Sequence, residues 1–215
     1  MKHWVFDLDG TIVDSLTVHF QILEKIFLKF NQPFSKKNHN ELLKVTSKTL
    51  PNYFEFQFGL ENVESALEMF SDLTNAALKS IKPFTGIEEL LKTLKSKGSL
   101  LAVWTARDLA ATQKILQYTG LESYFSICIS GCCTTQGKPH PEGLQKIANH
   151  FESDSSEMVM VGDFDSDMLG AQVFGTKAIR VLWHPSVEYK KCEIANWQFS
   201  KVSDFQNWID NSFKD

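Results

Sequence analysis

Short apolar runs alternate with amphipathic stretches along most of the chain. The first run, residues 3–8, combines branched and aromatic side chains and ends in Asp-Leu-Asp-Gly, a pattern typical of a buried strand followed by a turn. Strands that alternate with helices indicate an α/β fold with a doubly wound, mostly parallel sheet. The same pattern predicts strands at residues 100–104, 125–129, 158–161, 178–182 and 197–199, and helices at 87–98, 109–118, 142–151, 168–174 and 205–213.

Residues 15–82 interrupt this alternation with helical spacing alone. Apolar residues recur every three or four positions at 18–30 and again at 63–78, as on one face of an amphipathic helix. Because the segment directly follows the first strand, we predict an inserted all-helical cap domain of residues 15–82. The α/β core then comprises residues 1–14 and 83–215.

An aromatic stretch, residues 53–58, lies inside the predicted cap. Phe54, Phe56 and Phe58 alternate there with polar residues. We interpret these rings as core, because a small cap must bury apolar surface of its own. An aromatic wall over a substrate is the alternative interpretation.

The composition is typical of a globular protein. Of the 215 residues, 43% are hydrophobic and 22% are charged, which excludes a disordered tail or a fibrous repeat. The net charge of −4 provides no basic field for nucleic acid or anionic lipid. No stretch approaches the ~20 apolar residues that span a bilayer. We therefore expect no nucleic-acid or membrane partner, and a monomer or weak homodimer.

The four cysteines show no CxxC spacing, and the first residues, MKHWVFDLDG, indicate the start of a domain rather than a signal peptide. Reduced thiols are the simplest interpretation. We therefore expect a cytoplasmic location.

Polar and charged side chains follow four of the predicted strands. Because ligands bind outside the carboxyl ends of the strands in such sheets, we expect these side chains to form one site. They are Asp7 and Asp9, Thr105, Lys138, and Asp163 with Asp167.

This set of side chains suits a phosphoryl group. Neighbouring carboxylates repel each other unless a cation intervenes, and carboxylate oxygens are hard ligands that suit Mg²⁺. A metal, a lysine and a hydroxyl around a carboxylate would neutralise the phosphoryl oxygens. Taken singly, each residue also has a purely structural interpretation: Asp7 and Asp9 as turn caps, Lys138 as a surface lysine, and Asp163 with Asp167 at a helix start.

Together, the motifs resemble those of the haloacid dehalogenase superfamily. They are matched in order by residues 7–11 (Asp-Leu-Asp-Gly-Thr), Thr105, Lys138, and Gly162-Asp163 with Asp167. The resemblance runs from the first strand to Asp167. It implies a Rossmann-like core with a helical cap, in the branch that contains phosphoglycolate phosphatases and phosphoglucomutases.

The resemblance also implies roles for the acidic residues. Asp7 would be the nucleophile that forms an aspartyl-phosphate, and Asp9 would protonate the leaving oxygen and then activate water. The Asp7 carboxylate, the Asp9 backbone carbonyl and Asp163 would hold Mg²⁺.

The remaining motif residues would support this reaction. Lys138 would neutralise Asp7 and the transferring group, and Asp167 would fix Lys138 or a metal-bound water. Thr105 and the backbone N–H of Ala106 would donate hydrogen bonds to the phosphate.

Two positions depart from the motifs or extend them. Phe164 stands where the family often has a serine, which leaves the shape of that loop open. Arg107 would bind a distal carboxylate or second phosphate of the substrate, or form a surface ion pair with Asp108 or another acid.

Asp9 separates two activities within the superfamily. An alkoxide leaving group needs a proton and a halide does not, so a second aspartate favours a phosphatase or phosphomutase over a dehalogenase. We therefore expect an enzyme, a Mg²⁺-dependent phosphohydrolase that cleaves a small phosphorylated metabolite. The alternatives are a phosphomutase of the phosphoglucomutase kind and a catalytically idle binding or regulatory module.

Overall fold

The chain divides into two compact units, which are described separately. One unit comprises Met1–Asp14 and Ile81–Asp215, and the other comprises Ser15–Ser80. The structure is a computed structural model. It describes residues 2–35, 49–185 and 192–212, together with 38, 41, 45, 187 and 189.

The first unit is built on a six-stranded sheet with the strand order β5-β4-β1-β6-β7-β8. All pairings within this sheet are parallel, which confirms the predicted sheet type. A short antiparallel pair, β2 (Val13–Asp14) with β3 (Lys82–Pro83), was not predicted from the sequence. The six strands are β1 (His3–Phe6), β4 (Leu100–Trp104), β5 (Ile127–Ile129), β6 (Met158–Gly162), β7 (Lys177–Val181) and β8 (Trp197–Phe199).

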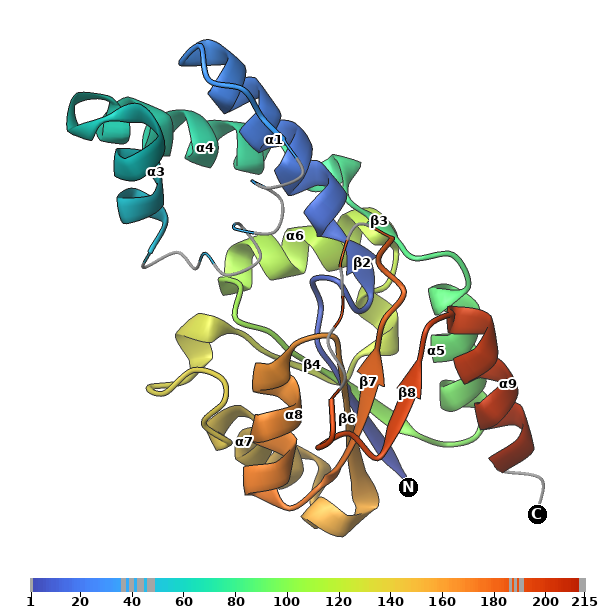
Figure 1. The fold of residues 1–215 in the computed structure, drawn as a ribbon. Coiled ribbons are helices and arrows are strands. Elements are labelled where there is room, and N and C mark those ends of the chain that lie inside the picture. The colour runs from blue at the N-terminus through green and yellow to red at the C-terminus, as the bar shows by residue number, and fades with distance from the viewer. Residues whose placement is uncertain are drawn as a thin grey trace. The chain divides into compact units, whose positions relative to one another are not determined.

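Helices cover both faces of this sheet (Figure 1). On one face α7 contacts β4 and β5, and α8 contacts β6 and β7; on the other, α5 contacts β4 and α9, and α9 contacts β8. The predicted helices are present, although α8 and α9 each begin three residues earlier than predicted. The helices of this unit are α5 (Ile87–Ser96), α6 (Leu109–Thr119), α7 (Glu142–Phe151), α8 (Asp165–Phe174) and α9 (Val202–Ser212).

The central strand β1 is buried on both faces. Val5 belongs to a core cluster with Leu144 of α7 and Met168 of α8. Trp4 lies on the opposite face, where its ring packs against that of Phe205 of α9 at 5.9 Å. Successive side chains of a strand point to opposite faces. Because helices cover both faces here, consecutive residues of β1 are apolar instead of alternating between apolar and polar.

The second unit is helical. Its main helices are α1 (Ser15–Lys29), α3 (Leu50–Phe58) and α4 (Val63–Ala77), and α4 contacts both of the others. Over the described part of the chain, no helix is both long and apolar enough to cross a membrane.

The aromatic stretch at residues 53–58 forms most of α3. Phe54 is fully buried and Phe58 is nearly so, with its ring 4.9 Å from that of Phe27. Phe56 is 82% exposed, so the interpretation of this residue as core was wrong. Residues four apart share one face of a helix whereas residues two apart do not, and this spacing separates Phe56 from the other two rings.

We expect Phe54→Ala to lower the free energy of unfolding by about 3–5 kcal/mol, because it opens a cavity in the helical unit. Phe56→Ala is the matched control from the same helix, and its effect is expected to stay within about 0.5 kcal/mol. Urea unfolding of both variants measures the difference. Equal effects of the two changes would contradict the assignment of Phe54 to the core.

Candidate active site

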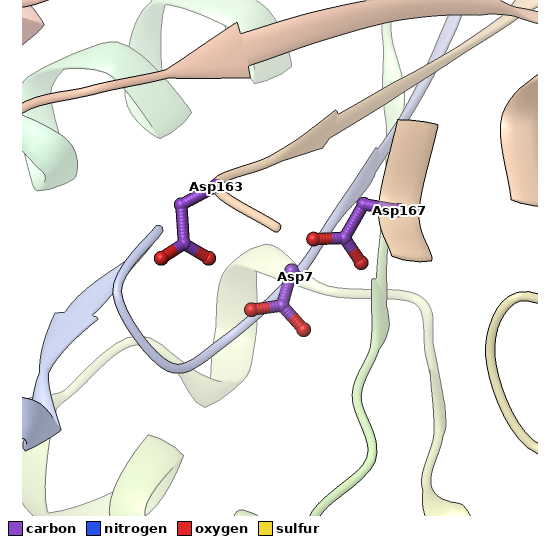
Figure 2. Close-up of side chains that lie close together, drawn as sticks. All are labelled: Asp7, Asp163 and Asp167. Carbon is purple, nitrogen blue, oxygen red and sulfur yellow. The ribbon is translucent and has the colours of Figure 1, made fainter. Parts of the chain in front are cut away.

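Three buried carboxylates lie together at the carboxyl ends of neighbouring strands. Asp7 follows β1, Asp163 follows β6, and Asp167 lies in the first turn of α8. One oxygen of each lies within 4.8 Å of the others. Figure 2 shows how the three side chains gather around one region.

Two glycines make room for these carboxylates. A Cβ atom on Gly10 would lie 2.4 Å from Oδ2 of Asp163, and the φ of +78° at Gly10 also favours glycine. A Cβ atom on Gly162 would lie 2.4 Å from Oδ2 of Asp167. The two motif glycines therefore allow side chains from other segments to approach the backbone closely.

Lys138 joins two of the carboxylates. Its Nζ atom donates hydrogen bonds to Oδ1 of Asp7 and to Oδ1 of Asp167, each at 2.6 Å. The Lys138 side chain is only 6% exposed. The second oxygen of Asp167 accepts a hydrogen bond of 3.1 Å from the backbone N–H of Phe164. Asp167 is therefore engaged on both of its oxygens.

Burial controls the electrostatics of this cluster. It raises the pKa of Asp7 to about 7; Lys138 opposes this shift, while Asp167 and Asp9 add to it. Burial and the charges of Asp7 and Asp167 likewise raise the pKa of Asp163 well above its usual value. Burial disfavours the charge on Lys138, but Asp167 and Asp7 outweigh it and raise the pKa of Lys138.

The cluster suits a hard divalent cation. Three carboxylates and one ammonium leave a formal charge of −2, and the acidic donors of Asp7, Asp163 and Asp167 are all oxygens. Mg²⁺ prefers oxygen ligands and binds through one or two carboxylates. The residues present therefore fit the predicted metal.

Asp9 has a different partner. Nε of Arg107 donates to its Oδ2 at 3.0 Å, and Nη2 donates to its Oδ1 at 2.6 Å. Two interpretations of Arg107 followed from the sequence, binding of a substrate group and an ion pair with an acidic residue. The structure shows an ion pair. The acid is Asp9 rather than Asp108, and the Arg107 side chain is only 10% exposed rather than on the surface. Binding of a substrate group by Arg107 stays a prediction.

The loop that begins at Thr105 is fixed by the end of β5 and the segment that follows it. The Thr105 N–H donates to the carbonyl of Ile129 at 3.0 Å, and the Gly131 N–H donates to the carbonyl of Arg107 at 2.9 Å. A Cβ atom on Gly131 would lie 2.4 Å from the carbonyl oxygen of Ala106. The backbone at Thr105 and Ala106 is thus held in place, and their hydrogen bonds to a phosphate stay predictions.

Glu142 fixes the loop that leads to Lys138, a role that was not predicted from the sequence. Its carboxylate accepts hydrogen bonds of 3.0 Å from the N–H groups of Thr135 and Gln136. A hydrogen bond from Lys146, followed by those from Gln136 and Thr135, lowers the pKa of Glu142 to about 2. The loop is therefore held by the Glu142 carboxylate at the start of α7.

Trp104 is a second residue for which no role at the site was predicted. The Nζ atom of Lys138 lies 4.7 Å from the centroid of its ring. An aromatic residue at the end of a predicted strand gives no signal of such a contact in the sequence, because core strands commonly contain aromatic residues.

Comparisons with known proteins agree on one family. The protein-family model described as "Haloacid dehalogenase-like hydrolase" matches residues 4–181. Phosphoglycolate phosphatase of Aquifex aeolicus is 28% identical over 215 residues, which cover 98% of each chain. Probable phosphatase IndB of Dickeya dadantii is 28% identical over 202 residues, 88% of this chain and 85% of that protein.

Among solved structures, a putative beta-phosphoglucomutase from Thermotoga maritima is similar in fold. Its TM-score is 0.84, with 20% sequence identity over 98% of this chain and 99% of the other. At this identity the likeness shows the fold alone. It supports the predicted Rossmann-like α/β class with a helical insertion.

We expect the metal-free protein to lose stability as the pH rises from 5 to 8. The raised pKa values of Asp7 and Asp163 mean that the native state retains protons which the unfolded state has released, so the free energy of unfolding falls over this range. Asp163→Asn removes one of the like charges. In EDTA it should raise the free energy of unfolding at pH 8 by about 1–3 kcal/mol, and by less at pH 5, where the unfolded state has only begun to gain from ionisation.

Urea unfolding at the two pH values measures this difference. Addition of Mg²⁺ at pH 8 should stabilise the wild type more than Asp163→Asn. An equal effect of the substitution at pH 5 and pH 8 would contradict the electrostatic interpretation.

Proposed function

We propose that this chain, which belongs to the haloacid dehalogenase-like hydrolases, is a Mg²⁺-dependent phosphatase that cleaves a small phosphorylated metabolite. The observation that carries the proposal is the contact of one buried ammonium, Lys138, with both Asp7 and Asp167, beside Asp163. The relatives named phosphatases support the same class of reaction.

Asp7 is the proposed nucleophile. One of its carboxylate oxygens attacks phosphorus, and the bond from phosphorus to the ester oxygen breaks to leave an aspartyl-phosphate. Asp9 gives a proton to the departing alkoxide. In the second step Asp9 takes a proton from water, which attacks phosphorus, releases inorganic phosphate and regenerates the Asp7 carboxylate.

Positive charge around Asp7 makes this attack feasible. Lys138 already lies 2.6 Å from Asp7 and would offset the charge on the phosphoryl oxygens as the two approach. Bound Mg²⁺, held by Asp7, Asp163 and the backbone carbonyl of Asp9, would supply the remaining positive charge. Thr105 and the Ala106 N–H would orient the phosphoryl group.

The ion pair between Arg107 and Asp9 bears on the two tasks of Asp9. The Arg107 guanidinium donates hydrogen bonds to both carboxylate oxygens of Asp9, the atoms that would give and take the proton. For the donation step the pair has to open. A second anionic group on the substrate could replace Asp9 as the partner of the Arg107 guanidinium, in line with the substrate-binding role predicted for Arg107 from the sequence.

A phosphomutase would use the same residues, with a sugar hydroxyl in place of water. The fold likeness to the protein named putative beta-phosphoglucomutase is the reason to test it. Isomer interconversion of a sugar monophosphate without release of free phosphate would favour the mutase.

We expect the wild type to release p-nitrophenol from p-nitrophenyl phosphate with Mg²⁺ and not with EDTA. Asp7→Asn should lower this turnover by more than about a thousandfold, because the nucleophile is lost. Asp165→Asn is the matched control, since that carboxylate is 76% exposed, and it should keep activity. Substantial turnover by Asp7→Asn would exclude Asp7 as nucleophile, and no turnover by the wild type on any phosphomonoester would favour the idle module.

Asp9→Asn should separate the two steps. The p-nitrophenolate group leaves without a proton, so we expect a burst of about one equivalent of p-nitrophenol, followed by slow turnover because water is no longer activated. An alkyl phosphate, whose alkoxide needs the proton, should give no burst. Rapid-quench measurement of the leaving group released from each ester tests this expectation. A burst with both esters would refute the role of Asp9 as the acid.

A further inference from the structure

The ammonium of Lys138 is enclosed by three different partners. It donates hydrogen bonds to Asp7 and Asp167, which use two of its three N–H groups. The ring of Trp104 lies 4.7 Å away from Nζ. A cation within about 6 Å of an indole ring is attracted by the negative potential of the ring face.

The ring of Trp104 is fixed by its own packing. A Cβ atom on Gly143 of α7 would lie 2.0 Å from Nε1 of the indole, and one on Gly170 of α8 would lie 2.7 Å from its Cη2. Trp104 itself is 2% exposed. The indole therefore occupies space that two helices leave open only because both positions are glycine.

The three partners of the ammonium differ in one respect that matters for the reaction. When Asp7 becomes an aspartyl-phosphate, its carboxylate loses its charge and the phosphoryl group brings negative charge of its own, so the position of the negative charge beside Lys138 changes. The attractions of Asp167 and of the indole ring do not depend on the state of Asp7. Because the ring is held by α7 and α8, it can hold the ammonium in place while the charge of Asp7 changes.

We propose that Trp104 is a positioning residue, whose indole face keeps the Lys138 ammonium beside Asp7 throughout the reaction. This inference rests on the proposed phosphatase function. It assigns a role to an uncharged side chain that touches neither the phosphoryl group nor the metal in the proposed mechanism.

The first test compares Trp104→Leu with Trp104→Phe and with Trp4→Leu. Trp4 is the matched control, because it is fully buried in the neighbouring strand β1 and packs on Phe205. We expect Trp104→Leu to lower kcat by about tenfold with little change in KM, and Trp104→Phe to recover most of the loss. Trp4→Leu should lower the melting temperature comparably and leave kcat within about twofold. Equal kcat values for Trp104→Leu and Trp4→Leu would overturn the proposal.

Fluorinated tryptophan provides a test that leaves the packing nearly unchanged. Ring fluorines withdraw electron density from the ring face and so weaken its attraction for a cation. The chain has five tryptophans, so the wild type and Trp104→Phe are both produced with mono- and difluorotryptophan. We expect kcat to fall stepwise with fluorine number in the wild type and to stay constant in Trp104→Phe. A constant kcat in both proteins would overturn the proposal.

NMR of the lysine ammonium groups supplies a readout that does not require turnover. The Lys138 signal, assigned by its loss in Lys138→Met, should be shifted upfield by the indole ring current and move downfield in Trp104→Leu but not in Trp4→Leu. Absence of the shift in the wild type would overturn the contact itself. If the shift is present but the wild type hydrolyses no phosphomonoester, the proposed function fails, and with it the catalytic part of this inference.

Discussion

The structure depends on the balance between one buried ammonium and the three buried carboxylates around it. Removing a carboxylate from water costs several kcal/mol, and Lys138 offsets only part of the negative charge. Burial, and after it the remaining repulsion, raises the pKa values of Asp7 and Asp163. A divalent cation would remove that repulsion, so the same imbalance that destabilises the metal-free fold favours metal binding. Burial of the three carboxylates thus lowers the stability of the metal-free protein and at the same time favours the metal binding that the proposed reaction needs.

Sheet topology brings this cluster together at little conformational cost. β1 and β6 are parallel neighbours, so Asp7 and Asp163 emerge side by side although most of the chain separates them in sequence. Gly10 and Gly162 then let the carboxylates lie against the backbone of another segment. A side chain at either glycine would have to displace a charged group with few other places to go. The positions of the charges are therefore set by the backbone before any ligand binds.

The sequence predicted the core elements well because both faces of the sheet are buried. A short apolar run such as Trp4-Val5-Phe6 is typical of a strand that helices cover on both sides. Errors arose where the spacing of apolar residues was misread or where an element was too short to show one. Phe56 alternates with polar residues as a strand residue would, but it lies on the exposed side of α3. The short β2–β3 pair has too few residues to carry a periodic signal.

The sequence predicted which residues meet at the site only where the order of strands in the sheet brings them together. The proximity of Asp7, Lys138 and Asp163 follows from the shared edge of a parallel sheet, whereas their chemical roles stay predictions. The partner of Arg107 depends on its rotamer, and the sequence does not encode that directly. Trp104 is harder still, since its contact with Lys138 depends on glycines in two separate helices. An uncharged partner leaves no charge pattern in a sequence, yet phosphorylation of Asp7 would leave its attraction for the ammonium unchanged.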